Sequence, residues 1–131
     1  MPSPRTILIA CSNPQWTQSL TETLGAWGLE VVCAGTVEEG RQILRARAIS
    51  LVFAEQNLPG GGLRELLKEL SPRLPTVRLI ALIQDETEYG EAIHAGAFDA
   101  IANPFPRSEV QWMVIQSLKD ADSSTRRSAR A

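Results

Sequence analysis

The chain has 131 residues, of which 44% are hydrophobic, and this is enough apolar material for the core of one domain. Thirteen Lys and Arg against fifteen Asp and Glu give a formal net charge of -2, so no global basic field favours nucleic acid or an anionic membrane as a partner. No apolar run could cross a bilayer, and residues 1–5 do not resemble a signal peptide. We therefore expect one cytosolic domain in which Cys11 and Cys33 stay reduced and serve packing.

The first strand and helix are predicted near the N-terminus. Residues 6–10 form a short apolar run that is typical of a buried strand. Asn13 and Pro14 follow as a helix cap and a first helical residue. We expect this helix to end at Gly28, with an apolar stripe made of Trp16, Leu20, Leu24 and Trp27.

A second strand and the central strand come next. Residues 29–34 predict a strand, and Thr36 with Glu39 predicts a capping box at the start of the helix that follows. Residues 51–54 are an unbroken apolar run, which indicates a strand buried on both faces of a parallel sheet. Glu55 then lies at the carboxyl end of this sheet, where open α/β folds keep their sites.

The second half continues the alternation of strands and helices. Three glycines at 60–62 predict a tight loop, and Asp85 begins a modest helix that ends before Gly96. The further expected elements are a helix at 63–70, strands at 77–83 and 99–102, and a last helix at 109–121. Short connections between parallel strands favour a doubly wound α/β domain, with helices on both faces of the sheet.

Several short motifs occur in one order and at one spacing: a strand followed by Pro14, and the segments 57–60, 95–99 and 103–105. Over residues 5 to 121 the chain resembles a response-regulator receiver domain. The resemblance implies a flavodoxin-like sheet with strand order 2-1-3-4-5. It also implies a cis peptide bond before Pro104, whose bend would aim Asn103 toward Glu55.

Receivers of this family accept a phosphoryl group on an aspartate, with Mg²⁺ held by an acidic pair and a lysine nearby. Mg²⁺ prefers oxygen ligands, and the transferred phosphoryl group needs positive charge beside it. The resemblance places Glu55 at the phosphoacceptor position, and Cys11 and Ser12 at the acidic pair. It places the two switch residues and the lysine at Ala81, Ala100 and Asn103. These changes indicate a degenerate pseudo-receiver with no metal and no cofactor.

The role of Glu55 has two interpretations. Its side chain is one methylene longer than that of aspartate, so it resembles a phosphoaspartate in charge and reach and could act as a built-in phosphomimic. Alternatively, Glu55 is a polar residue that is hydrogen-bonded at the mouth of the sheet. Ala81 and Ala100 favour this second interpretation, because the residues that would respond to the charge are missing.

We expect a non-enzymatic signalling module of a two-component or phosphorelay system that acts by protein–protein interaction. One alternative is a receiver phosphorylated through an unorthodox site. Another is a small flavodoxin-like enzyme or ligand-binding domain, for which Glu55 and Asp85 are the only candidate titratable groups.

The partner surface is predicted on the fourth helix, fifth strand and fifth helix. On the last helix Trp112 and Ile115 point away from the core-facing stripe, and Tyr89 lies on the neighbouring helix. Exposed large apolar side chains are typical of an interface, so we expect a histidine kinase, another signalling protein or a second copy to bind here. Residues 122–131 are predicted to be a disordered basic tail or the start of a linker.

Overall fold

The computed structural model describes residues 5–73 and 76–122. Five parallel strands form one sheet in the order β2-β1-β3-β4-β5. This confirms the predicted doubly wound α/β fold and its strand order. The strands are β1 (Thr6–Ala10), β2 (Glu30–Ala34), β3 (Leu51–Glu55), β4 (Arg78–Ile83) and β5 (Asp99–Ala102).

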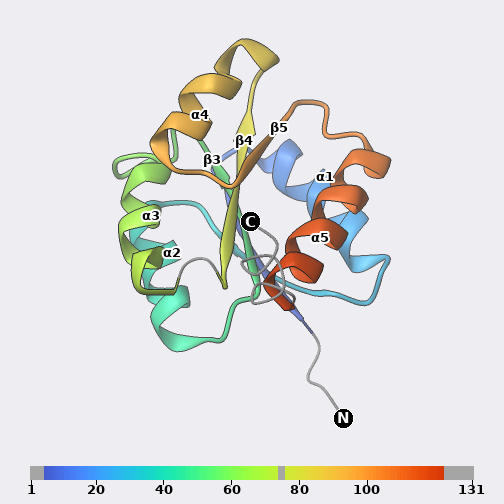
Figure 1. Cartoon of the computed structure of the whole chain (residues 1–131), viewed down its shortest axis with the longest axis horizontal. Helices are drawn as coiled ribbons and strands as arrows, with labels where there is room; N and C mark the ends of the chain where they lie inside the picture. The colour runs from blue at the N-terminus through green and yellow to red at the C-terminus, as the bar shows by residue number, and fades with distance from the viewer. Residues whose placement is uncertain (1–4, 74–75, 123–131) are drawn as a thin grey trace, which may run out of the picture.

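Helices cover both faces of the sheet (Figure 1). One face carries α2 (Val37–Ala46), α3 (Leu63–Leu70) and α4 (Tyr89–Ala95), and the other carries α1 (Pro14–Gly25) and α5 (Arg107–Asp122). Residues of β1, β3 and β4 are buried throughout, apart from the partly exposed Glu55 at the end of β3. Successive residues of each strand supply the two cores in turn, because side chains alternate between the faces of a sheet. This double burial explains the continuous apolar runs in the sequence.

Helix α1 begins as predicted but ends earlier. The Asn13 side chain accepts hydrogen bonds from the backbone N–H groups of Gln15 and Trp16, and Pro14 is the first helical residue. The helix ends at Gly25, so Trp27 lies beyond it and is exposed. Its predicted place in the buried stripe was therefore wrong, because a residue outside the helix no longer follows the helical repeat.

The segment before α4 also departs from the prediction. A 3₁₀ turn, η2 (Glu86–Glu88), precedes α4, where the sequence indicated one continuous helix from Asp85. Asp85 and Glu88 form a reciprocal capping box, which satisfies backbone N–H groups at the start of the turn. The chain then bends into the short α4, which ends at Gly96 in a left-handed conformation.

The three glycines before α3 do form a tight loop. Gly60, Gly61 and Gly62 all have positive φ, which residues with a side chain rarely adopt. At Gly62 a Cβ atom would lie 2.8 Å from the backbone oxygen of Gln56. The loop therefore passes so close to the segment after β3 that a residue with a side chain would not fit at this position. The glycines thereby place the start of α3 beside residues that follow Glu55.

Other predictions have mixed outcomes. Cys11 and Cys33 are both free thiols; Cys11 is buried, but Cys33 is exposed, so packing does not explain Cys33. Helix α5 begins two residues earlier than predicted and includes Asp122, while the rest of the predicted tail lies outside the described residues. Within the described part of the chain, no helix has the length and apolar character needed to span a membrane.

Candidate functional site

Glu55 and Ser12 meet at the carboxyl edge of the sheet. Glu55 is the last residue of β3, and Ser12 follows the neighbouring strand β1 by two residues. The Ser12 backbone N–H and the Ser12 hydroxyl each donate a hydrogen bond of 2.8 Å to Oε1 of Glu55. The carboxylate is thus held by one residue in the loop after the adjacent strand, with both bonds on the same oxygen.

Asn103 takes no part in this arrangement. The peptide bond between Asn103 and Pro104 is cis, as predicted, but the Asn103 side chain is exposed. Among the described residues, the two hydrogen bonds that the Glu55 side chain accepts both come from Ser12. The predicted orientation of Asn103 toward Glu55 was therefore wrong: Asn103 follows β5, which β4 separates from β3, and its side chain is exposed to solvent. Ser12 follows β1, which pairs directly with β3.

The residues at this edge do not fit a magnesium ion. Mg²⁺ binds through oxygen ligands, with carboxylates as its usual protein donors. Cys11 is buried, and burial raises the pKa of its thiol above the ordinary value. Its sulfur contacts the backbone oxygen of Asn13 at 3.6 Å. Ser12 offers only a neutral hydroxyl, which donates its hydrogen to Glu55. The described residues contain no cluster of three His, Cys, Asp or Glu side chains suited to a metal.

Ala81 and Ala100 lie opposite one another on β4 and β5. Both are buried, at 0% and 4% exposure, within the core on the α2, α3 and α4 face. Neither side chain has a hydroxyl that could bind a phosphoryl oxygen or a ring that could rotate between the interior and the surface. The structure therefore packs these two positions as ordinary core.

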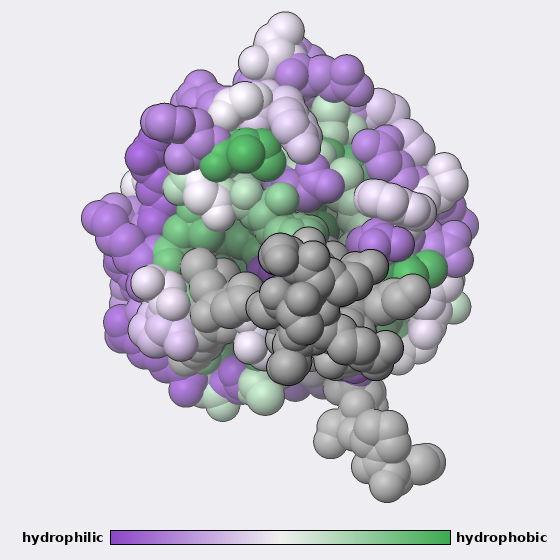
Figure 2. Space-filling model, viewed as in Figure 1, coloured by the Kyte–Doolittle hydropathy of each residue, from purple (hydrophilic) through white to green (hydrophobic). Residues whose placement is uncertain are grey.

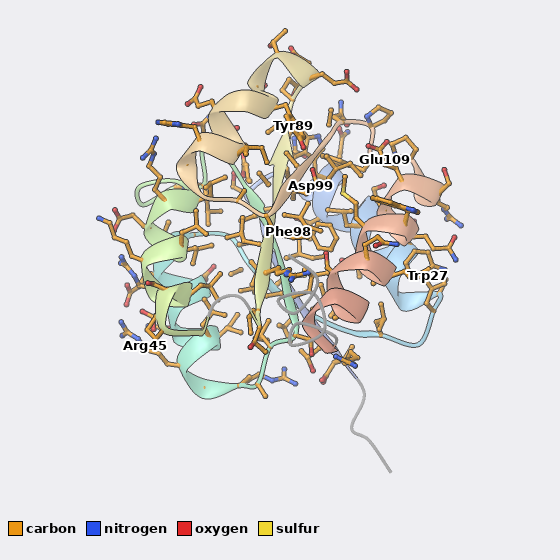
Figure 3. The ribbon with its side chains drawn as sticks, viewed as in Figure 1. Trp27, Arg45, Tyr89, Phe98, Asp99 and Glu109 are labelled. Carbon is orange, nitrogen blue, oxygen red and sulfur yellow. The ribbon has the colours of Figure 1, made fainter. Side chains whose placement is uncertain are left out.

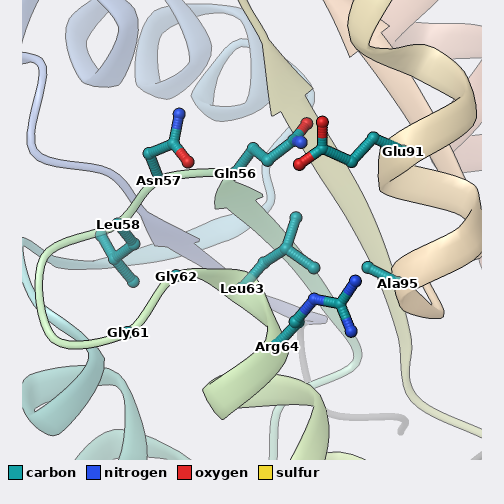
Figure 4. Close-up of a pocket in the computed structure, with 9 residues that line it drawn as sticks. All are labelled: Gln56, Asn57, Leu58, Gly61, Gly62, Leu63, Arg64, Glu91 and Ala95. Atoms are coloured by element: carbon teal, nitrogen blue, oxygen red, sulfur yellow. The ribbon is translucent and has the colours of Figure 1, made fainter.

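A polar cavity of about 330 Å³ opens beside the residues that follow Glu55, between the start of α3 and the helix α4. Its walls include Gln56 and Asn57 after β3, Gly62 and Arg64 at the start of α3, and Glu91 on α4. Figure 4 shows the Gln56 amide and the Glu91 carboxylate pointing toward one another across this cavity. The amide oxygen of Gln56 is buried and accepts no hydrogen bond from the described residues.

Large apolar side chains are exposed on α4, β5 and α5. Trp112 is 58% exposed, Ile115 52% and Tyr89 45%. The Tyr89 hydroxyl donates a 2.9 Å hydrogen bond to Asp99 of β5, and this carboxylate raises the pKa of the tyrosine. Phe98 is 39% exposed and stacks on the buried guanidinium of Arg78 at 4.2 Å from the ring centre.

Two adjoining cavities lie on this face and share Asp99 and Met113. The larger, of about 460 Å³, also has Tyr89 and Glu109 in its walls. The smaller, of about 100 Å³, has Phe98, Trp112, Gln116 and Ser117. We call the pair the β5 groove. Ile115 lines neither cavity, so the structure does not bring it together with Trp112 and Tyr89 in this groove.

Figure 3 shows Tyr89, Asp99 and Phe98 at the centre of the view, with Glu109 beside them on α5. In Figure 2 apolar surface lies in the middle of the same view, with hydrophilic surface around it. The sequence indicated Trp112 and Tyr89 but not Asp99, Phe98 or Glu109. One feature of the sequence could have indicated Asp99: it stands at the start of the fifth strand, between two helices that carry exposed aromatic residues.

Comparisons with known proteins agree with this fold. The chain is 29% identical over 118 residues to the response regulator protein PilR of Pseudomonas aeruginosa, and 31% identical over 105 residues to FleR of the same organism. These alignments cover 86% and 76% of the chain. The chain spans only 26% of PilR and 21% of FleR. No protein-family model matches the sequence.

A solved structure has the same fold. The signal receiver domain of an HD domain-containing protein from Pseudomonas fluorescens superposes with a TM-score of 0.84 at 22% identity, and the match covers 97% of this chain and 96% of that one. At this identity the likeness concerns the fold. Together, the relatives in sequence and the shared architecture support a response-regulator receiver domain of the CheY-like kind.

Proposed function

We propose that the chain is a degenerate receiver, or pseudo-receiver, of cytoplasmic two-component signalling that works without phosphorylation, through contacts with other proteins. The observation that carries this proposal is the arrangement at Glu55, whose Oε1 accepts both hydrogen bonds from Ser12 where a working receiver needs metal-binding acids. The receiver fold is retained, while the groups required for phosphoryl transfer are replaced.

The chemistry supports this proposal. Phosphoryl transfer to a carboxylate needs cations beside the transferred group, because charge spreads over its oxygens in the transition state. Cys11 and Ser12 provide no carboxylate for a metal, and the exposed amide of Asn103 provides no ammonium group. A lone Glu55 therefore has neither of the positive charges that this reaction requires.

We further propose that Glu55 is a hydrogen-bonded polar residue and not a phosphomimic. Its carboxylate is held toward β1 by Ser12, away from β4 and β5. A phosphomimic acts only if a second residue changes position in response to its charge. Ala81 and Ala100 at the switch positions have no group that could do so.

Intact-mass analysis after treatment with Mg²⁺ and a small phosphodonor tests the proposal. We expect no mass increase of one phosphate for the wild-type chain. The Ser12→Asp/Glu55→Asp variant is the matched control, since it places two carboxylates at adjacent strand ends and should bind Mg²⁺ more tightly. A wild-type phosphate adduct that disappears in Glu55→Ala would contradict the proposal and favour an unorthodox phosphorylation site.

The partner contact is proposed on the face formed by α4, β5 and α5. This face exposes three large apolar side chains, which is unusual for the surface of a monomer: Trp112, Ile115 and Tyr89. Candidate partners are a histidine kinase, another signalling protein or a second copy of the chain. A Trp112→Ala/Ile115→Ser variant should stay folded and lose association in sedimentation or partner pull-down. Unchanged association would place the interface elsewhere.

A further inference from the structure

The β5 groove combines an apolar floor with an acidic rim. Met113 is 6% exposed and forms part of the floor of both cavities, while Phe98 and Trp112 form the walls of the smaller one. Carboxylates of Asp99 and Glu109 line the larger cavity, and Glu86 from the turn before α4 adds a third. The groove thus offers apolar contact and negative charge within one surface.

The cations of the described residues lie outside the lining of this groove. Neither cavity has a Lys or Arg side chain among its described lining residues. Arg78 contacts Phe98, a wall residue of the smaller cavity, but the Arg78 guanidinium is buried beneath the Phe98 ring and does not line the groove. The Asp99 carboxylate accepts bonds from the Tyr89 hydroxyl and the Ala100 N–H. Both donors are neutral, so no cation among the described residues is in contact with this carboxylate.

We propose that the β5 groove binds a basic amphipathic segment of a partner protein, with an apolar side chain against Met113 and Trp112 and Lys or Arg beside Asp99 and Glu109. This inference rests on the proposed protein-interaction function and adds the chemistry of the partner. Opposite charge at the rim speeds association and selects the partner, while aromatic anchors in a desolvated pocket supply most of the affinity. A second copy of the chain presents the same acidic rim, so charge complementarity disfavours it as the occupant.

A direct test uses the full chain and model peptides in fluorescence anisotropy. Three labelled peptides share one length: an amphipathic Leu/Lys sequence, the same sequence with Glu for Lys, and a basic Ser/Lys sequence without apolar residues. We expect only the first to bind with a measurable Kd. Binding should weaken as the salt concentration rises from about 0.05 M to about 0.5 M, because exposed charges are screened.

Variants locate the binding and separate charge from apolar contact. Asp99→Asn/Glu109→Gln keeps the Asp99 hydrogen-bond acceptor, and it should weaken Leu/Lys binding about tenfold and reduce its salt dependence. Trp112→Ala should weaken binding about tenfold through lost apolar contact. Glu22→Gln/Glu38→Gln removes the same amount of charge from α1 and α2, outside the groove, and should bind like wild type.

Each contrary outcome overturns a defined part of the account. Equal binding of the Leu/Glu peptide, lost in Trp112→Ala, contradicts the basic partner and leaves the protein-interaction function intact. No binding of the Leu/Lys peptide, or binding unchanged in Asp99→Asn/Glu109→Gln, contradicts the groove itself, and the phosphodonor experiment still tests the proposed function separately.

Two further outcomes would assign the groove to another occupant and also overturn the inference. One is self-association of the chain that is lost in Trp112→Ala. The other is a gain of more than about tenfold in Leu/Lys binding when Arg126, Arg127 and Arg130 are all changed to Gln, because the chain's own C-terminal arginines would then be the competitor.

Discussion

Changing Gly62 to alanine should destabilise the domain through one short loop. Gly62 has φ of 80°, and an added Cβ would lie 2.8 Å from the backbone oxygen of Gln56. A residue in a sparsely populated backbone conformation costs about 1–3 kcal/mol. The Gln56 oxygen also accepts a 3.2 Å hydrogen bond from the Leu63 N–H at the start of α3. Displacing that oxygen adds about 1 kcal/mol.

The expected loss for Gly62→Ala is therefore about 2–4 kcal/mol of unfolding free energy. A domain of ordinary stability stays folded after this loss, since its free energy of unfolding is about 5–15 kcal/mol. In urea denaturation followed by tryptophan fluorescence, the midpoint should fall by roughly 1–2 M with an unchanged slope of about 2 kcal/mol per M.

Gly90 provides the matched control for this experiment. It lies inside α4, and a Cβ atom there would meet no heavy atom within 4 Å. Gly90→Ala should raise the free energy of unfolding by about 0.5–1 kcal/mol, because alanine favours a helix over glycine. A wild-type midpoint for Gly62→Ala, or shifts of both alanine variants in the same direction, would show that Gly62 is not required by its positive φ and its contact with Gln56.

Two further predictions concern stability. Asn13→Ala removes the cap of α1 and should lower the free energy of unfolding by about 1 kcal/mol in urea denaturation; an unchanged midpoint would show that solvent caps the helix equally well. Glu65 accepts hydrogen bonds from Lys68 and Arg41, and these lower its pKa. Its contribution to stability is therefore present above the unfolded-state pKa and lost as the pH falls through the lower folded-state pKa. The stability difference between wild type and Glu65→Gln should shrink over that acid range in pH-dependent denaturation, and a difference that grows toward acid pH would contradict the assignment.

The sequence was sufficient for the architecture because both faces of the sheet are buried. Runs such as residues 51–54 are apolar throughout only if helices cover both sides, and the short connections leave little choice but parallel strands. Local capping signals at Asn13 and Thr36 then located the starts of α1 and α2 correctly. Helix ends were harder, as at Gly25, because the last turn depends on the packing of the loop that follows.

The candidate site was only partly predictable for a different reason. Which residues stand at the carboxyl edge follows from strand order, so Glu55 and Ser12 could be named in advance. Which of them bond to one another depends on side-chain rotamers and on the path of each loop, and these decided between Ser12 and Asn103. The acidic rim of the β5 groove joins Asp99 of β5 to Glu109 of α5, a pairing that depends on how α5 rotates against the sheet.

The most direct test of the central claim is a Mg²⁺ titration of the ¹⁵N-labelled chain, followed in ¹H–¹⁵N correlation spectra. The Ser12 amide donates to Glu55, so its resonance reports any metal or phosphoryl group that reaches this carboxylate. We predict that the Ser12 and Glu55 amide resonances stay in place at millimolar Mg²⁺, with or without a small phosphodonor. The corresponding resonances should move in Ser12→Asp/Glu55→Asp. A saturable shift of the wild-type Ser12 resonance with Mg²⁺, followed by a new phosphodonor-dependent set of peaks, would contradict a phosphorylation-independent receiver.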